Sequence, residues 1–251
     1  MMNAAPSPSI AAIRKEMAPG GVLRAGINLG NPVIVQADPA GGDPNGVGPE
    51  LARELGRRIG VPVQFVKYET AGKLADAVKE GAWDVAFLAI DPARAVDIEF
   101  TDAYAHIEGT YMVPQSSPLR STADADREGI RIAVGLKTAY DLFLTREIRR
   151  ALLIRMGSSA AAIDQFLADG LDAVAGVRQP LEAAARKHPG HRVLEESFMV
   201  IRQASGVPHG RAAAARYLAD FIEECKSSGF VAKALAQSGI TDVAVAPARG
   251  F

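Results

Sequence analysis

The sequence is poor in the features that mark several classes of protein. Its one cysteine, Cys225, excludes an internal disulfide and any cysteine-based zinc site. No stretch approaches the roughly 18 consecutive apolar residues of a membrane-spanning helix. The 28 lysines and arginines are balanced by 29 acidic residues, which gives a net charge of -1. Because a non-specific nucleic-acid binder carries a basic excess, we expect no nucleic-acid partner.

Catalytic and cofactor motifs are missing too. The chain has no Gly-x-Ser-x-Gly elbow, no phosphate-binding Walker loop and no His-Glu-x-x-His pair. His188 and His191 lie in a Pro-Gly turn without a thiol or carboxylate nearby in sequence, which favours a solvated turn over a metal site. The glycines of GGVLRAGINLGNP are followed by a proline where a dinucleotide-binding helix should begin. We therefore expect no metal, no cofactor and no catalytic residue.

What is present is a regular alternation of strand and helix patterns in 251 residues, 48% of them hydrophobic. Residues 22–27, 61–66 and 84–90 have the pattern of strands, and the helices between them end at Gly60 and Gly81. This β-α-β-α-β order predicts a doubly wound α/β sheet.

A second set of elements lies inside the first. Two helices, 210–227 and roughly 230–237, end the chain. The strands predicted before them are 109–113, 130–134, 171–177, 192–194 and 198–201. The sequence therefore predicts two α/β modules, with the second inserted before the first is complete.

An arginine follows the end of the third predicted strand. Residues 84–90 are almost continuously apolar, and Asp91 breaks the run shortly before Arg94. Ligands of open α/β sheets bind outside the carboxyl ends of the strands. A guanidinium offers a fork of donors that matches a carboxylate. A surface salt bridge to Asp91, Asp97 or Glu99 is the alternative, and spacing alone leaves both open.

The stretch IAVGLKTAYD offers a second anion site. A strand is predicted to end at Gly135, and a helix to begin near Thr138. Free N–H groups at a helix N-terminus bind anions, and the Thr138 hydroxyl is a further donor. Plain N-capping by Thr138 is the alternative, and capping and binding can coexist. With Arg94 in one module and this helix in the other, both could contact one carboxylate across a cleft.

Several stretches, taken in order, resemble one family, the type II periplasmic solute-binding proteins of the polar amino-acid ABC transporter class. Its first strand and ligand loop resemble VLRAGINLGNP. Its later strands and helices are similar, in order, to GVGPELARELGRRIGVPVQFV, EGAWDVAFLAIDPARAVDIEFTDAY, IRIAVGLKTAYDLFL, GLDAVAGV and SGFVAKALAQSG. The resemblance covers roughly residues 20–240, and the ordered set is more specific than any single motif.

The resemblance implies two α/β lobes joined by a two-strand hinge that closes on a ligand. Lobe I would comprise residues 1–108 and 204–251, and lobe II residues 109–203. The hinge crossings would fall near Ala105–Gly109 and Gln203–Gly206. The inserted module predicted from the strand and helix patterns agrees with this arrangement.

By resemblance, Arg94 takes the place of the family's carboxylate-binding arginine, and the Thr138-Ala139 backbone takes that of its partner site on lobe II. The position of an aromatic residue that often covers the ligand falls near Asn31. The residues predicted to bind ligand are Asn31, Ala89, Asp91, Arg94, Thr138, Ala139, Tyr140 and Arg178.

The chain departs from the family where an amino-acid ligand's ammonium group is bound. In the amino-acid binders an acidic residue follows the GLDAVAG-like strand, but here that position is Val177, followed by Arg178. A buried ammonium without a counter-charge is costly. Arg178, if it faces the cleft, would favour a second anionic or carbonyl group, whereas Asp91 could serve a cation. An amino acid and an organic acid, such as a dicarboxylate, both stay open.

Two classes of function follow. The first is a monomeric, non-catalytic protein that captures a small carboxylate-bearing solute for an ABC permease, or as an unexported sensor. The second is a lyase on the same scaffold, because the chain also resembles cyclohexadienyl dehydratases. Such an enzyme needs a general acid, and the candidates next to the cleft are Asp91, Glu108 and Asp141.

The resemblance implies a periplasmic location. The first residues, MMNAAPSPSIAAIRKEM, lack the roughly 7–15-residue apolar core of a secretory signal. Either a signal was removed before this numbering begins, or the protein is cytoplasmic.

Overall fold

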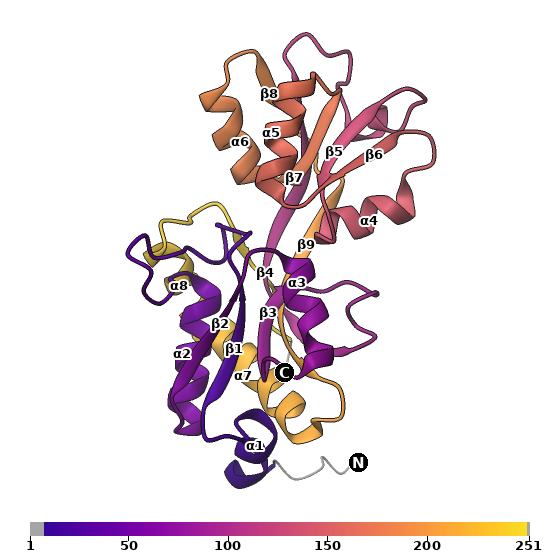
Figure 1. Cartoon of the computed structure of the whole chain (residues 1–251). Helices are drawn as coiled ribbons and strands as arrows, with labels where there is room; N and C mark the ends of the chain where they lie inside the picture. Colours follow the sequence, from indigo (N-terminus) through magenta and orange to yellow (C-terminus); the bar gives the residue numbers. More distant parts are fainter. Residues whose placement is uncertain (1–7, 250–251) are drawn as a thin grey trace.

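The computed structural model describes residues 8–249 and consists of two lobes, the lower and upper halves of Figure 1. Both lobes are α/β, which confirms the predicted fold class. Residues 1–7 and 250–251, which belong to the predicted lobe I, lie outside the described residues. Within residues 8–249 no helix is both long and apolar enough to cross a membrane.

Lobe I, the lower lobe, has the predicted β-α-β-α-β order and is completed by the two C-terminal helices (Figure 1). Its elements are α1 (Ile10–Met17), β1 (Leu23–Asn28), α2 (Val47–Ile59), β2 (Val63–Tyr68), α3 (Ala71–Asp76), the 3₁₀ turn η1 (Ala77–Glu80), β3 (Val85–Ala89), α7 (Ala212–Ser227) and α8 (Phe230–Gln237). Helix α2 ends as predicted at Gly60, whose φ of 66° suits glycine.

The core of lobe I lies on both faces of its sheet. Every residue of β3 is buried, as predicted for a parallel strand covered on both sides. Phe87 belongs to the apolar cluster that contains Leu55 of α2 and Phe221 of α7. Leu88, one residue on, packs in a second cluster with Leu74 of α3. The carboxyl end of β3 is thereby fixed in place.

Lobe II, the upper lobe, repeats this arrangement with its own strands and helices. Its elements are the 3₁₀ turn η2 (Thr122–Ala125), β5 (Arg131–Gly135), α4 (Ala139–Glu147), β6 (Leu152–Met156), α5 (Ser159–Asp169), β7 (Ala173–Val177), α6 (Arg178–Lys187) and β8 (His191–Val193). The sequence did not predict β6, because it is a half-exposed edge strand without a continuous apolar run.

Two long strands run from one lobe to the other, β4 (Ile98–Pro114) and β9 (Met199–Pro208) (Figure 1). They make one sheet of both lobes, in the order β2-β1-β3-β9-β4-β7-β5-β6. The prediction of strand 109–113 was too short, because β4 continues back to Ile98.

Strands β4 and β9 pair with each other along the segment that connects the lobes. Ala105 pairs with Gln203 and Gly109 with Met199. The segment of β9 opposite residues 105–109 is therefore 199–203, which shares Gln203 with the predicted second crossing. The C-terminal strand β10 (Ala244–Val245) pairs with β4 at Ala105 and His106 and adds a third strand there.

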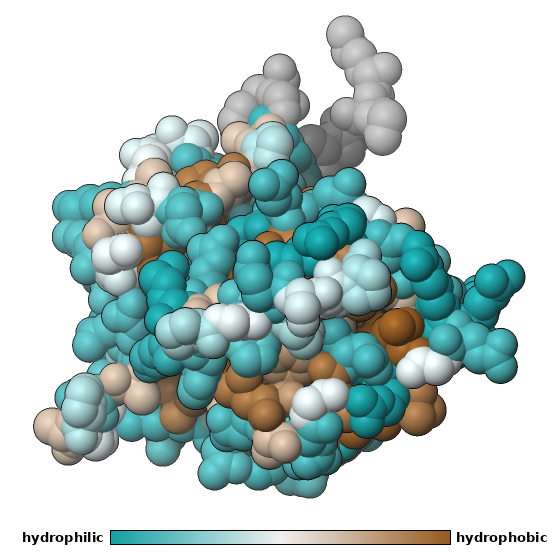
Figure 2. Space-filling view, turned by 90° about the horizontal axis from the view of Figure 1, so that it is seen from above, coloured by the Kyte–Doolittle hydropathy of each residue, from teal (hydrophilic) through white to brown (hydrophobic). Residues whose placement is uncertain are grey.

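Figure 2, which looks down on the molecule from above, shows no broad apolar surface on this face. Hydrophobic residues form small groups on this face, separated by hydrophilic ones. Among the described residues, the large hydrophobic side chains that are exposed lie apart from one another along the chain and are Ile10, Val96, Leu136, Leu152 and Val200. Single exposed residues of this kind are ordinary in soluble proteins.

Candidate functional site

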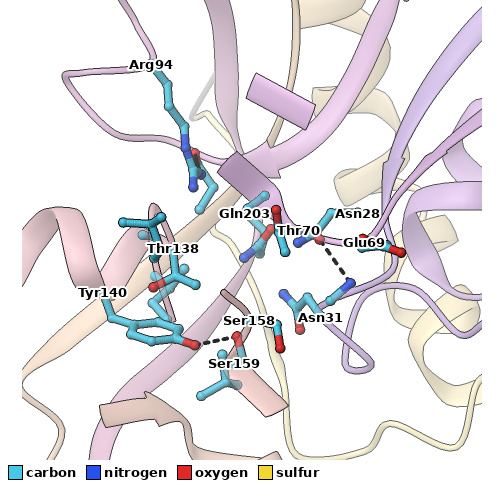
Figure 3. Close-up of a pocket in the computed structure, with 17 residues that line it drawn as sticks. Asn28, Asn31, Glu69, Thr70, Arg94, Thr138, Tyr140, Ser158, Ser159 and Gln203 are labelled. Carbon is cyan, nitrogen blue, oxygen red and sulfur yellow. Dashed lines mark hydrogen bonds between the residues drawn. The ribbon is translucent and has the colours of Figure 1, made fainter. Parts of the chain in front are cut away.

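Side chains from both lobes surround two adjoining cavities between them. The larger cavity has a volume of about 610 Å³, within the usual range of ligand pockets. The two share lining residues from both lobes, among them Asn31, Thr70, Tyr140 and Ser158, so we treat them as one site, the interlobe cavity. Figure 3 shows these side chains converging on it.

The cavity lies at the carboxyl ends of the parallel strands of both lobes. Asn28 is the last residue of β1, Ala89 of β3 and Val177 of β7. Thr70 closely follows β2, and Leu136 directly follows β5. Open α/β sheets bind their ligands at these ends, and here two sheet edges face each other.

Arg94 lines the smaller part of the interlobe cavity, which has a volume of about 50 Å³, and its guanidinium points inward (Figure 3). The side chain is only 5% exposed. Nη1 donates to the Ala89 carbonyl at 2.8 Å, and Nη2 donates across the lobes to the Lys137 carbonyl at 3.0 Å. Nε has no partner among the described residues. Two backbone carbonyls therefore orient the group without neutralising it.

The alternative of a salt bridge with a neighbouring acid is not realised. Within residues 8–249 no carboxylate pairs with Arg94. Burial lowers the pKa of the Arg94 guanidinium to about 10, against the opposing effect of the Asp91 and Asp76 carboxylates. The side chain is still charged at neutral pH. It is a buried cation that no carboxylate of the described residues contacts, an arrangement that is costly in a folded protein.

Helix α4 begins at the opposite wall of the cavity. The Thr138 hydroxyl accepts from the Asp141 amide at 3.1 Å and donates to the Gly135 carbonyl at 2.8 Å, so the predicted N-cap is present. The amides of Ala139 and Tyr140 have no hydrogen-bond partner within residues 8–249. Free amides at a helix start attract anions. Thr138, Ala139 and Tyr140 all line the cavity, on the wall that faces Arg94.

A second helix also starts at the cavity. Ser158 caps α5 by accepting from the Ala161 amide at 3.1 Å. The Tyr140 hydroxyl lies 2.6 Å from the Ser159 hydroxyl oxygen, as Figure 3 shows. The positive ends of two helices, α4 and α5, therefore point at the same space as Arg94.

Two of the predicted site residues do not line this cavity. Asp91 is 3% exposed and accepts from Arg146 Nη2 at 2.9 Å, so it closes an ion pair between the lobes. Arg178 donates from Nε to Glu108 at 2.5 Å and from Nη2 to the Glu195 carbonyl at 2.7 Å. It faces a separate cavity behind the hinge strands, because these acceptors hold it away from the interlobe cavity.

The structure adds residues to the site that the sequence did not indicate. Asn28, Glu69 and Gln203 line the cavity together with Asn31. Gln203 is 4% exposed and comes from β9, whose passage between the lobes has no local signal. Asn28 and Glu69 could have been found from the rule that strand ends carry ligands. The Asn31 side-chain oxygen is buried without a partner among the described residues.

The lobes also touch outside the cavity, at the turn that precedes α4. Lys137 Nζ lies 2.6 Å from the Asp76 carboxylate of α3. A Cβ on Gly72 of α3 would lie 2.6 Å from the Lys137 Cβ, so only glycine permits this approach. Lys137 itself has a φ of 56°, the one positive value at a non-glycine residue among those described. The lobes therefore contact each other outside the cavity as well.

The candidate general acids have other partners. Asp141 accepts from Arg155 Nε at 2.9 Å and from the Lys137 amide at 2.8 Å. Glu108 is paired with Arg178, and neither Glu108 nor Asp141 lines the interlobe cavity. Within residues 8–249 no group of three or more His, Cys, Asp or Glu side chains could hold a metal ion.

Comparison with known proteins gives the same fold. A mutant of ArgBP from T. maritima is 21% identical, with a TM-score of 0.76, over 91% of this chain and 99% of that chain. The solute receptor for L-cysteine of Neisseria gonorrhoeae is 23% identical, with a TM-score of 0.76, over 92% of this chain and 93% of that chain.

A third structure is the ancestral amino acid-binding protein AncCDT-1, described as a precursor of cyclohexadienyl dehydratase. It is 21% identical, with a TM-score of 0.75, over 90% of this chain and 99% of that chain. No curated protein matches the sequence. The family model of the bacterial extracellular solute-binding proteins, family 3, matches residues 23–238. The match spans most of the chain, which therefore belongs to that family of solute-binding proteins.

Proposed function

We propose that this protein captures a small carboxylate-bearing solute between its two lobes and delivers it to the permease of an ABC transporter. The observation that carries the proposal is Arg94, a buried cation in the interlobe cavity that no carboxylate of the described chain neutralises. A ligand carboxylate would supply the missing charge. Hydrogen bonds to charged groups contribute about 1.5–3 kcal/mol each.

The second wall of the cavity supports the same ligand group. The partnerless amides of Ala139 and Tyr140 lie at the start of α4, where an anion is favoured. A carboxylate between Arg94 and this helix would contact both lobes at once, so its binding favours the closed form over the open one. Capture by closure of this kind suits a protein that must hold a dilute solute.

The lobes would move as the predicted bodies, residues 1–108 with 204–251 against residues 109–203. The crossing at β4 and β9 would be the hinge, since few chain segments connect the lobes elsewhere (Figure 1). The protein would act as a monomer in the periplasm, beside its permease. An unexported sensor with the same cavity is the second form of this proposal.

The lyase alternative gains no support from the cavity. A dehydratase needs a general acid within reach of its substrate. Asp91 and Asp141 are paired with Arg146 and Arg155, and Glu108 faces the separate cavity behind the hinge. Glu69 does line the interlobe cavity, but its carboxylate is 79% exposed and paired with Lys73. The likeness to the dehydratase precursor concerns the fold, and that precursor is itself described as an amino acid-binding protein.

The test is a thermal-shift screen of the purified protein against amino acids, dicarboxylates, oxo acids, hydroxy acids and aromatic ring acids. A ligand present at a hundred times its dissociation constant should add about 2.7 kcal/mol of stability. Arg94→Ala should abolish the shift. Arg178→Ala is the matched control, because it removes an arginine outside the cavity, and it should keep the shift. A panel without any hit, or a hit that Arg94→Ala retains, would contradict the proposal.

A further inference from the structure

The charges around the interlobe cavity are unbalanced in favour of the positive sign. Arg94 and the amino ends of α4 and α5 all face it. Among the described residues that line it, Glu69 is the one with an acidic side chain. That side chain is 79% exposed, and its carboxylate lies 2.5 Å from Lys73 Nζ. It is a solvated, paired charge at the rim.

The other acids near the cavity are already neutralised. Asp91 is bound by Arg146, Asp141 by Arg155 and Asp76 by Lys137, each at 2.6–2.9 Å. None of the three lines the cavity. A ligand's ammonium group would therefore meet Arg94 and two positive helix ends without a free carboxylate.

The wall at the end of β7 is apolar. Val177 lines the cavity there, next to Gly176, Pro180 and Leu181. An ammonium group against this wall would lose its water and gain no counter-charge, which is strongly unfavourable. An uncharged group would lose far less.

The remaining walls indicate what the solute carries in place of the ammonium. The Asn31 side-chain oxygen is buried without a donor, and a ligand hydroxyl would supply one without the charge of an ammonium. The amide nitrogen of the same side chain can donate to an oxo group. The far end of the larger cavity is lined by Leu29, Pro32 and Ile163. Such a surface accepts an apolar chain or ring and offers no partner to a second charge.

We propose that the cavity selects monocarboxylic acids that lack an ammonium group and carry a hydroxyl or oxo group and an uncharged, mainly apolar tail. This inference rests on the proposed function and narrows the class of solute. It separates the protein from the amino-acid binders, whose fold it shares.

The experiment is isothermal titration of the full chain, unfolded and refolded beforehand to remove carried-over solute. Two matched trios differ only in the group beside the carboxylate. One is leucine, 2-hydroxy-4-methylpentanoate and 4-methyl-2-oxopentanoate. The other is phenylalanine, phenyllactate and phenylpyruvate. In at least one trio an acid without the ammonium should bind at least tenfold more tightly than the amino acid.

The outcomes distinguish failure of the inferred solute class from failure of the proposed function, solute capture. An amino acid that binds as tightly as its hydroxy and oxo partners, or more tightly, overturns the inference while leaving solute capture intact. Absence of binding by all six compounds also overturns it. If the wider carboxylate panel fails as well, the proposed function falls with it.

A pair of variants at Val177 tests whether the missing acidic side chain causes the preference for acids without an ammonium group. Val177→Asp supplies the missing acid, and should shift the preference at least tenfold toward the amino acid of the binding trio. Val177→Asn has nearly the same shape as Val177→Asp but carries no charge. It should leave the preference for the hydroxy or oxo acid unchanged. Equal changes in the two variants would contradict the charge argument.

Discussion

Two buried tyrosines differ in whether their hydroxyl groups have a hydrogen-bond partner. The Tyr140 hydroxyl lies 2.6 Å from that of Ser159, whereas the Tyr104 hydroxyl has no partner among the described residues. A lost hydrogen bond costs about 0.5–1.5 kcal/mol, but an unpaired buried hydroxyl is itself unfavourable. We expect Tyr140→Phe to lower the free energy of unfolding by about 1 kcal/mol, and Tyr104→Phe to leave it unchanged or raise it. Urea titration measures both, and a larger loss for Tyr104→Phe would contradict the assignment.

Single residues of the site were predictable where a strand or helix end placed them. Arg94 and Ala89 follow from the end of an apolar strand, and Thr138 from its capping position. All three line the cavity, although their role in binding stays a prediction. Arg178 could not be placed in this way, because its direction depends on acceptors distant in sequence, above all Glu108.

At the scale of elements, the contact of α3 with the turn before α4 requires a glycine. A Cβ on Gly72 would lie 2.6 Å from the Lys137 Cβ in the other lobe. Gly72→Ala should hold the lobes apart and weaken solute binding at least tenfold. It should not destabilise the ligand-free protein, because alanine favours the helix by about 1 kcal/mol.

Titration of Gly72→Ala with the solute, beside thermal unfolding without it, checks both parts. Gly20→Ala is the matched control, because a Cβ there has no atom within 4 Å. Unchanged affinity in Gly72→Ala would show that the lobes do not meet at this contact when solute is bound.

Helix α2 carries a carboxylate whose titration should affect stability in acid. Hydrogen bonds from Arg57, and then from Arg58, lower the pKa of Glu54 to about 2 from 4.5. Since the folded pKa lies below the unfolded one, the stabilisation is complete above about pH 4.5 and is lost as the pH falls towards 2. We expect Glu54→Gln to lose less unfolding free energy than the wild type across this window, as measured by urea titration. Parallel losses in the two proteins would contradict this.

The elements themselves were predictable to different degrees. Helix α2, which ends at Gly60, and helix α5, which is capped by Ser158 and ends at Gly170, follow from local sequence. Strand β6 and the first half of β4 do not, because pairing with distant strands defines them.

At the scale of the whole molecule, ion pairs join the lobes outside the cavity. The pair of Lys137 with Asp76 crosses between them at 2.6 Å. Exposed pairs contribute about 0–1 kcal/mol, so Asp76→Asn should weaken solute binding by at most about fivefold, through loss of the closed form. Asp97→Asn is the control, because its partner Lys79 lies in the same lobe. Titration calorimetry would contradict this role if both variants weakened binding equally.

The central claim is that a solute carboxylate neutralises Arg94 between the lobes. A crystal structure of the protein with the tightest-binding acid tests it most directly. The account predicts carboxylate oxygens about 2.7–2.9 Å from the Arg94 guanidinium nitrogens and within hydrogen-bond reach of the amide at Ala139 or Tyr140. A solute bound elsewhere, or one that turns an uncharged end towards Arg94, would contradict it.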